Sequence, residues 1–438
     1  MIYKNKLIET IQYKVDAVTV SPLSIKDGDD NLKLDNTTGK FYIPGSSVAG
    51  AFRNYYENYI NNHMHHENNL FGGTDTGMNK LVCYDAFAAG QQIISSRPGL
   101  RIDRRTLTDY RFFSAGKKVG SKFKRHFLND GVRFIFVFEL NNYNGVDGFE
   151  NIKSQFELLL AAFSAGDILL GNNKMIGFGR FEVNSVHKTE YNLCKYEDVY
   201  NYLLKKRHYI DITELILNNK SDLKNVRFKI KAKTTTPVLI KDEVVRSSRE
   251  PDGINLKNSN NEYIIPGSSL KGVLRARAEK LAKTFPCINS KVLTNIFGVE
   301  SNNEDEAHIS RFVCYDTIIK NAAIGIYNKV KIDYFTGGVQ KHALMSEETV
   351  MGDLEIECAF NTFGLEQYDK EIGLLLLVLR DLCTENLNVG GGYAVGRGYI
   401  KADTLELIHG QKMIYNFNSP DKLVEEQFNS YISKLMVG

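Results

Sequence analysis

Residues 43–53 of the chain read IPGSSVAGAFR, and residues 265–275 read IPGSSLKGVLR. Seven of the eleven positions are identical, whereas two unrelated segments of ordinary composition would share about one. In each segment Pro and Gly end an extended stretch, and the apolar residues that follow recur at helical spacing. A match of this length within one chain indicates an internal repeat.

Further matches follow this motif in the same order in both halves. LFGG at 70–73 corresponds to IFGV at 296–299, LVCYDAF at 81–87 to FVCYDTI at 312–318, Arg101-Ile102-Asp103 to Lys331-Ile332-Asp333, and GNNKMIGFGR at 171–180 to VGGGYAVGRG at 389–398. Because the offsets differ only by small insertions, the two halves are collinear. We therefore predict two tandem domains, 1–222 and 223–438, the second of which ends in an added helix near 420–436.

Both halves predict the same order of elements. The first half has a strand pattern at 13–25, a helix after IPGSS, strands at CYD and 132–140, a second helix near 151–165, a glycine-rich loop and a last strand. The second half repeats this order, with strand patterns at 226–240 and 353–360 and a second helix near 370–385. The order β-α-β-β-α-β predicts an α+β chain of two ferredoxin-like, RRM-like domains.

The composition excludes several classes of protein. Hydrophobic residues make up 43% of the 438 residues and charged residues 24%, so the chain is neither disordered nor collagen-like. The longest apolar run, 374–379, is too short to cross a membrane, and the first residues lack a secretory signal pattern. We therefore expect a cytoplasmic protein with no membrane partner. The six cysteines form no CxxC pair, which argues against a structural zinc site.

The net charge of +3 is too small to indicate a nucleic-acid partner, so the local distribution decides. Residues 97–133 hold eleven Lys or Arg against three Asp, with aromatic residues interleaved. Cations that neutralise phosphates and rings that stack on bases are typical of nucleic-acid binding, and Arg101, Arg104 and Arg105 are the candidate contacts. The alternative is a solvated, charged hairpin. The corresponding segment of the second half, 320–352, is far less basic.

Two further features of each half are candidate phosphate sites. The start of a helix offers free N–H groups, so Ser46, Ser47, Ser268 and Ser269 are candidate caps and RNA contacts, with Arg53, Arg275 and Lys271 on the following turns. The alternative is a plain helix cap with solvated arginines. The glycine-rich loops let a backbone approach a phosphate, beside Arg180 in the first half and Arg397 in the second; the alternative is a flexible turn.

The loop that precedes IPGSS is acidic in both halves. The acidic residues are Asp27, Asp29, Asp30 and Asp35 in the first loop and Asp242, Glu243, Glu250 and Asp252 in the second. A carboxylate near bound RNA can position a metal-bound water or the attacking 2′-hydroxyl. The alternative is ordinary solvated loop chemistry.

Taken together, these motifs resemble the RAMP superfamily of CRISPR-associated proteins, and most closely the backbone subunits of type III effector complexes. Because the pattern occurs twice, the chain resembles a tandem fusion of two such subunits. The resemblance implies an RRM-like palm that binds the CRISPR guide RNA and a thumb-like hairpin, here near 97–133, that kinks the duplex of guide and complementary target RNA. It also implies other CRISPR effector subunits as partners.

The resemblance further implies that an aspartate before IPGSS supports cleavage of target RNA with a transiently bound divalent metal, Mg²⁺ or Mn²⁺. Counting back along the family pattern selects Asp29, with Asp30 next to it, and Asp252; Asp29 and Asp252 would hold the metal. Two alternatives stay open. One is a purely structural RNA-binding or end-capping subunit, and the other is a standalone, metal-independent guide-processing endoribonuclease that relies on a general-base histidine.

Overall fold

A computed structural model of the chain describes residues 6–28, 31–60, 70–72, 78–103, 110–114, 117–143, 148–219, 225–242, 251–299, 308–340 and 343–436. The chain divides into two compact units. Unit 1 contains residues 1–95, 126–174 and 178–224, and unit 2 contains residues 96–125, 175–177 and 225–438. Unit 2 therefore includes two segments of the first sequence repeat.

Unit 1 is built on an antiparallel sheet whose central strand is β1 (Leu7–Thr19). Its paired strands, in order, are β11 (Ile210–Asp211), β10 (Phe181–Asn192), β1, β9 (Arg133–Tyr143), β4 (Ala86–Ala89) and β2 (Tyr42–Ile43), and β3 (Leu81–Cys83) also pairs with β9. Alternate residues of β1, such as Tyr13 and Val15, are buried, as expected for a strand with one face on the core.

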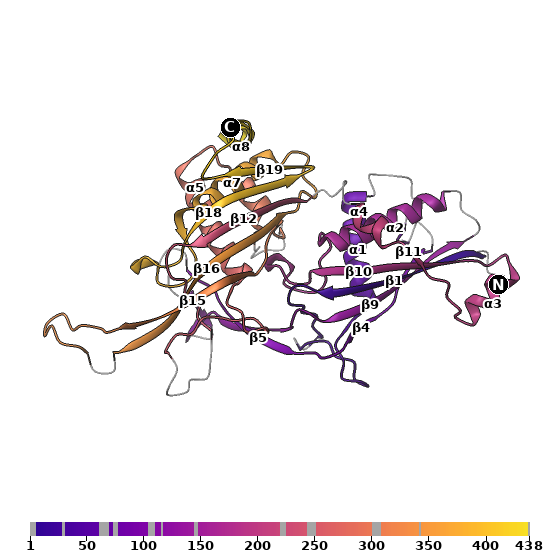
Figure 1. The fold of residues 1–438 in the computed structure, drawn as a ribbon, viewed down its shortest axis with the longest axis horizontal. Coiled ribbons are helices and arrows are strands. Elements are labelled where there is room, and N and C mark those ends of the chain that lie inside the picture. Colours follow the sequence, from indigo (N-terminus) through magenta and orange to yellow (C-terminus); the bar gives the residue numbers. More distant parts are fainter. Residues whose placement is uncertain are drawn as a thin grey trace. The chain divides into compact units, whose positions relative to one another are not determined.

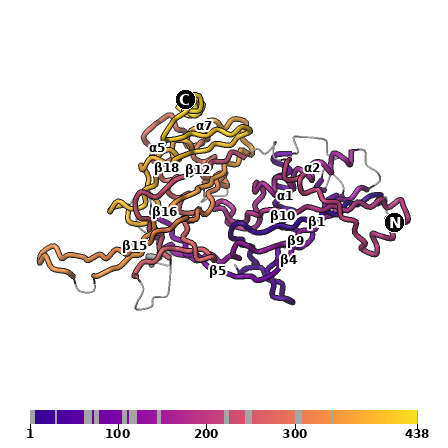
Figure 2. Tube along the Cα trace, viewed as in Figure 1, coloured from indigo at the N-terminus to yellow at the C-terminus, as the bar shows by residue number. Residues whose placement is uncertain are grey.

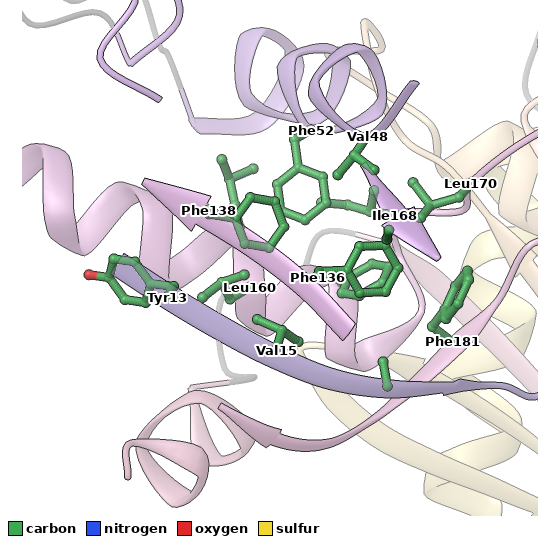
Figure 3. Close-up of a cluster of buried hydrophobic side chains, with 14 of the residues drawn as sticks. Tyr13, Val15, Val48, Phe52, Phe136, Phe138, Leu160, Ile168, Leu170 and Phe181 are labelled. Atoms are coloured by element: carbon green, nitrogen blue, oxygen red, sulfur yellow. The ribbon is translucent and has the colours of Figure 1, made fainter. Parts of the chain in front are cut away.

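The helices of unit 1 are α1 (Gly45–Tyr55), which continues as a π-helical turn (Tyr56–Ile60), α2 (Phe149–Ala165), α3 (Tyr196–Leu203) and α4 (Thr213–Asn218). Between α1, α2 and the sheet lies a core rich in aromatic rings (Figure 3). The ring of Phe52 on α1 lies 5.5 Å from that of Phe138 on β9, and Phe136 lies 5.4 Å from Phe163 on α2. These edge and tilted contacts fix how α1 and α2 lie on the sheet.

The sheet of unit 2 repeats this order around its central strand β12 (Val226–Thr234). Its paired strands are β13 (Ile264–Ile265), β15 (Thr317–Lys329), β16 (Met345–Phe360), β12, β18 (Tyr399–His409) and β17 (Thr384–Asn388). In addition, β14 (Phe312–Cys314) pairs with β16 and β19 (Gln411–Asn416) pairs with β18. The counterparts of β10, β1 and β9 are therefore β18, β12 and β16.

The α-helices in the described part of unit 2 are α5 (Gly267–Thr284), α6 (Ser290–Phe297), α7 (Asp369–Cys383) and α8 (Lys422–Met436). The helix α7 contacts α5, α6 and α8 as well as β17 and β18, and Figure 1 shows α5, α7, α8 and β18 close together. Because α7 is covered on all sides, its residues 371–379 are all buried, which explains the apolar run 374–379 without a membrane. No helix of the described residues is long and apolar enough to cross a membrane.

Long hairpins extend from both repeats. In the second repeat, β15 and β16 pair along their length, and Figure 2 shows their tip projecting from the sheet of unit 2. In the first repeat, β5 (Ile94–Leu100) pairs with β8 (Lys122–Leu128), and β6 (Arg111–Ser114) pairs with β7 (Lys117–Gly120). The predicted strand 13–25 begins and ends about six residues earlier than expected, because residues 20–26 form a loop with isolated bridges.

Candidate nucleic-acid interface

The two IPGSS motifs start α1 and α5 in the same way. Pro44 and Pro266 occupy the N-cap positions, and the first helical N–H groups donate to carboxylates of the CYD motifs. Gly45 N–H donates to Asp85 Oδ1 at 2.7 Å, and Gly267 N–H donates to Asp316 Oδ1 at 2.9 Å. The recurrence of both motifs thus has a structural cause: each aspartate stabilises the helix that follows IPG.

The glycine in each motif is required by a close approach of two backbones. A Cβ atom on Gly45 would lie 2.1 Å from Cys83 O, and one on Gly267 would lie 2.0 Å from Cys314 O. The serines stand further along, at the second and third helical positions. The expectation that Ser46 or Ser47, and Ser268 or Ser269, cap these helices is therefore wrong, because the cap comes from a distant aspartate; their contacts with RNA stay a prediction.

Arg53 and Arg275 occupy equivalent positions on α1 and α5. Arg53 Nε donates to Glu57 at 2.6 Å, and Arg275 Nε donates to Glu279 at 3.0 Å. Each pair spans one helical turn and is partly exposed, so it contributes little to stability. The predicted phosphate contact of each arginine is compatible with this geometry, since the contact seen among the described residues uses only its Nε.

Lys271, a third predicted contact, lies in a buried and fully engaged position. Its Nζ donates to Ser310 Oγ at 2.7 Å, to Phe312 O at 2.7 Å and to Met175 O at 3.1 Å. Burial lowers the pKa of Lys271 to about 8. In this structure the lysine links α5 to the β14 region and to the glycine-rich segment of the first repeat.

The two glycine-rich loops form the same backbone hydrogen bonds. The residues that these bonds make equivalent differ from those obtained by aligning Arg180 with Arg397. Leu170 N–H donates to Gly179 O, and Val389 N–H donates to Gly398 O. This pairing sets an offset of 219 residues, so the counterpart of Arg397 is Phe178 and not Arg180. Positive φ angles at the matching glycines explain their recurrence. Gly166, at the end of α2, lies beside the Arg180 side chain.

Arg397 and Glu347 form a buried ion pair on the second repeat, and two partly exposed lysines lie beside it. Arg397 Nη1 lies 2.7 Å from Glu347 Oε2, and its guanidinium lies 5.0 Å from the Tyr327 ring centroid. Lys241 Nζ and Lys329 Nζ lie 2.9 and 2.5 Å from the same carboxylate. Three cations around one buried carboxylate leave a local excess of positive charge. No sequence motif singled out Glu347, Lys241 or Lys329.

Asp252 lies next to this cluster. Its Oδ2 accepts the Ser346 N–H at 2.9 Å, and its own N–H donates to Ser346 Oγ at 3.3 Å. The adjacent Gly253 forms a parallel bridge with Glu347 and lies beside Lys241. The acidic loop thus holds the Asp252 carboxylate at the start of β16, close to the positive charges.

The acidic loop of the first repeat can be aligned with that of the second, because each loop is closed by an equivalent β-bridge. Lys26 pairs with Leu32, and Lys241 pairs with Asn255, which gives an offset of 223 residues on the IPGSS side of the loop. By this count Asp29 is the counterpart of Asp252. Asp29 and Asp30 lie outside the described residues, as do Glu243 and Glu250.

Two other acidic residues of these loops stabilise turns. Asp35 accepts the N–H and hydroxyl of Thr38, and the hydroxyl and N–H bonds together lower the Asp35 pKa. Asp27 Oδ1 accepts the Asn31 N–H at 3.0 Å. These contacts are those of ordinary turn chemistry.

The basic segment of the first repeat combines cations with rings. The Arg101 guanidinium lies 4.6 Å from the Tyr110 ring centroid, and that of Arg125 lies 4.4 Å from Phe123. Arg104 and Arg105 lie outside the described residues. Arg97 is engaged differently, since its Nη1 lies 2.8 Å from Asp316 Oδ2.

The tip of the second hairpin exposes two neighbouring rings. Tyr334 is 94% exposed and Phe335 is 93% exposed, with their ring centroids 5.6 Å apart. Asp333 shapes this tip by accepting the N–H groups of Thr336 and Phe335. Sequence reasoning missed the pair, although it lies directly after the matched motif Lys331-Ile332-Asp333 and so carried a signal.

A comparison with protein families now bears on these features. The model of the RAMP superfamily matches residues 16–182 and 231–401, which together exceed half of the chain. The chain belongs to the RAMP superfamily. No curated protein matches it. The two matched regions agree with a tandem fusion of two RAMP domains.

Membership of the RAMP superfamily indicates a CRISPR-associated, RNA-binding subunit. The mixed helices and antiparallel sheets of both RAMP repeats agree with the predicted α+β class. In this setting the exposed arginines, the aromatic hairpin tip and the cationic cluster are the parts of the RAMP chain with the chemistry to contact RNA.

The described residues around Asp252 do not form a permanent metal site. Mg²⁺ usually keeps several waters and is bound by one or two carboxylates together with substrate phosphates. Among the described residues there is no group of three or more His, Cys, Asp or Glu that would bind a metal permanently.

Removing the equivalent arginines tests the RNA contacts. We expect Arg53→Ala and Arg275→Ala each to weaken RNA binding and to reduce the slope of log affinity against log salt by about one, because each removes one phosphate contact. Fluorescence anisotropy with labelled guide RNA measures both. Arg380→Ala on α7, an exposed arginine beside Asp381, is the control. Unchanged affinity and slope in both variants would contradict this role.

Proposed function

We propose that this RAMP protein is a backbone subunit of a type III CRISPR effector ribonucleoprotein in antiviral defence. It holds the guide RNA and the duplex of guide and target RNA, while base pairing reads the target sequence. The observation that carries the proposal is the repetition of one arrangement in both repeats: a helix start with its aspartate, an arginine on the third turn, and an acidic loop in matching register.

Each repeat is proposed to be a ferredoxin-like, RRM-like palm. The strand order supports this, because the central strand lies between the last and the third strands of each β-α-β-β-α-β unit. The two helices of the first β-α-β-β-α-β arrangement are α1 and α2, and those of the second are α5 and α7. This topology leaves one sheet face free of those helices.

The two hairpins are proposed to be thumbs that contact the guide–target duplex. In the first repeat, the pairs Arg101–Tyr110 and Arg125–Phe123 combine charge with rings, a chemistry that suits phosphates and bases. In the second repeat, Tyr334 and Phe335 provide two exposed neighbouring rings. We therefore propose that the first thumb binds the phosphates of the duplex electrostatically, and that the second thumb inserts its rings against the bases.

Target cleavage is proposed at the acidic loops. Asp252, and Asp29 by register, would hold a divalent Mg²⁺ or Mn²⁺ ion that neutralises charge on the scissile phosphate. The carboxylate of Asp252 is fixed by the Ser346 N–H, so it is oriented before RNA binds. Lys241 and Lys329 are near enough to Gly253 and Glu347 to attract the phosphate to the loop.

The test is a reconstitution with guide RNA and the other effector subunits. We expect the complex to retain guide RNA and to cut a complementary labelled target only when divalent metal is present. If cleavage persists in EDTA, the metal-dependent function is wrong and the guide-processing alternative gains support.

A purely structural subunit is the second candidate. One observation favours it: Asp252 makes two hydrogen bonds with Ser346, which is what a carboxylate that only stabilises its loop would do. The same assay separates the two candidates, since a structural subunit would bind guide and target without cutting in either metal.

The second thumb gives a further prediction. We expect the double variant Tyr334→Ser/Phe335→Ser to weaken retention of the guide–target duplex at least about tenfold, because stacking on a base is worth roughly 1–3 kcal/mol. Since both rings are exposed, the melting temperature should not change. Duplex binding and thermal melting measure the two effects. A variant that binds duplex like the wild type would contradict the wedge.

A further inference from the structure

The segment between β10 and β12 lies outside both regions that match the RAMP superfamily, 16–182 and 231–401. It contains α3, β11 and α4, and the family match does not account for it. Helix α4 contacts α2, whereas α3 contacts β10. No residue of α3 is buried, although five of its eight residues are tyrosine, valine or leucine. A helix of this composition that is nowhere buried indicates an interaction surface.

Helix α3 lies on the face of the first sheet that α1 and α2 leave uncovered, opposite to α4 (Figure 1). In β1, Tyr13 faces the core beneath α2, so Thr10 faces the other side. The partner of Thr10 on β10 is Tyr191, whose ring centroid lies 5.4 Å from that of Tyr202 on α3. Tyr191 also donates its hydroxyl to Lys206 O at 3.0 Å. One side of α3 is thus attached to the sheet, and the opposite side faces away from it.

The side of α3 that faces away from the sheet carries a stripe of large exposed residues. Tyr196 is 84% exposed, Tyr200 48% and Leu203 71%, and their spacing of four and three residues places them on one face of the helix. Tyr209, which follows the helix, is also exposed. Contiguous exposed patches of this kind mark interaction sites on soluble proteins.

Cations lie beside two of these rings. Lys206 Nζ lies 5.2 Å from the Tyr200 ring centroid, and Lys14 Nζ on β1 lies 5.6 Å from that of Tyr209. Arg207 Nη1 donates to the Tyr209 hydroxyl at 3.1 Å. These contacts join the stripe and the residues after it into one continuous surface of the first unit. We call it the tyrosine surface, and its residues are Lys14, Tyr196, Tyr200, Leu203, Lys205, Lys206, Arg207 and Tyr209.

The positive charge of the tyrosine surface is concentrated after α3. Residues 203–210 include Lys205, Lys206 and Arg207 and no acidic residue. The acidic residues of α3 itself, Glu197 and Asp198, lie in its first turn, where they complement the helix dipole. The Asp198 carboxylate also accepts a backbone N–H at 3.1 Å. The end of the surface that follows α3 is therefore cationic.

We propose that the tyrosine surface binds single-stranded RNA, with unpaired bases stacked on its rings and phosphates held by its cations. Exposed rings next to a cationic stretch are the chemistry that binds unpaired nucleotides without reading their sequence, whereas a duplex hides the faces of its bases. A protein partner fits less well, because lysine is depleted in protein interfaces. The inference rests on the proposed function in one respect, since the unpaired part of the guide RNA is the occupant.

The second repeat uses the corresponding part of its chain differently. After β18 it forms β19 and α8, and α8 packs on α7 with Phe428 and Leu435 buried. Within the described residues the tyrosine surface thus belongs to the first repeat alone. Unpaired RNA is therefore expected to follow the first repeat, and substitutions in α3 should not be masked by an equivalent surface in the second.

The test is binding of a labelled oligouridine of about 12 nucleotides to the full-length chain, measured by fluorescence anisotropy. We expect Tyr196→Ser/Tyr200→Ser to weaken binding at least about tenfold, because each ring stacks on one base. Tyr196→Phe/Tyr200→Phe should bind like the wild type, since the ring stacks and the hydroxyl does not. Leu215→Ser, an exposed position on α4, is the control. The same comparison in an Arg53→Ala/Arg275→Ala background separates this surface from the palms.

A salt titration tests the cations of the surface. Lys205→Gln/Lys206→Gln should reduce the slope of log affinity against log salt by about 1.4, because each phosphate neutralised on a single strand contributes about 0.7. Since both lysines are exposed, the melting temperature should equal that of the wild type. An unchanged slope would contradict the phosphate contacts.

The proposal is overturned if the wild type does not bind oligouridine, if the serine variant binds it like the wild type, or if cross-linking of the native complex finds a protein on α3. The proposed function is judged separately, by whether the assembled complex retains guide RNA and holds the guide–target duplex. A complex that does both while the serine variant binds oligouridine normally would remove only the tyrosine surface.

Discussion

Replacing Glu347 with glutamine is expected to lower the free energy of unfolding of unit 2 by about 3 kcal/mol at pH 7. The carboxylate is buried and binds Lys241, Lys329 and Arg397. Glutamine keeps the shape but leaves three cations close together without a counter-charge, and breaking a buried ionic group typically costs about 3–5 kcal/mol. Urea denaturation followed by circular dichroism measures the change.

The pH dependence of this effect has a definite sign. Burial alone would raise the pKa of Glu347, but hydrogen bonds from Lys329, Lys241 and Arg397 outweigh it and lower the pKa from 4.5 to about 2. Because the folded pKa is below the unfolded one, the stabilisation is complete above about pH 4.5 and is lost as the pH falls toward 2. The shift corresponds to at most about 3 kcal/mol, because Lys241 and Lys329 are partly exposed and their interaction is screened by water. The stability difference between wild type and Glu347→Gln should therefore shrink between pH 4.5 and pH 2.

Glu355→Gln is the matched control, because it makes the same change on the same strand. Glu355 forms an exposed pair with Lys320, and such pairs contribute at most about 1 kcal/mol. If Glu347→Gln costs no more than Glu355→Gln, the ionic cluster does not stabilise the second repeat.

Asp252→Asn is expected to slow one of two cuts in the target RNA by about 100-fold or more, the scale on which loss of a charge-stabilising group acts. Asparagine can still accept the Ser346 N–H that orients the loop, but it lacks the negative charge that holds a divalent ion. Asp29→Asn should abolish the other cut. The two cuts should be spaced by the repeat of domains along the guide, because each carboxylate acts on a nearby phosphodiester.

The assay is a time course of end-labelled target RNA with the assembled complex, in Mg²⁺ or Mn²⁺ and in EDTA. Asp242→Asn, in the same loop, should leave both cuts. Binding should survive Asp29→Asn and Asp252→Asn, because loop carboxylates repel phosphate. Both cuts persisting in the double variant would show that these aspartates are not catalytic, and a wild type that cuts in neither metal would favour the structural subunit.

The sequence predicted the repeat and its elements because both are local patterns. The helix after IPGSS, the strand at CYD and the helices near 151–165 and 370–385 all follow from spacing and turn residues, and the structure contains them. The link between two of these motifs could not be predicted. Asp85 lies 40 residues from Gly45, so its role as a helix cap depends on how the strands pair.

The candidate site was predicted less completely, for a related reason. Residue type alone predicted that Lys271 and Arg397 contact phosphate. In the folded chain both side chains are buried among oxygen acceptors. Matching the loops by their arginines also gave the wrong register, since the backbone pairing aligns Arg397 with Phe178. Exposure is equally a tertiary property, which is why Tyr334 and Phe335 became evident only in the folded hairpin.

The central claim, that both repeats of this RAMP chain hold guide and target RNA through their hairpins, is tested most directly by ultraviolet cross-linking of the assembled complex followed by mass spectrometry. The account predicts cross-linked peptides from the β5–β8 segment, including Tyr110 or Phe123, and from the β15–β16 tip at Tyr334 or Phe335. Cross-links confined to other surfaces, such as α3 or α8, or none to this chain, would contradict it.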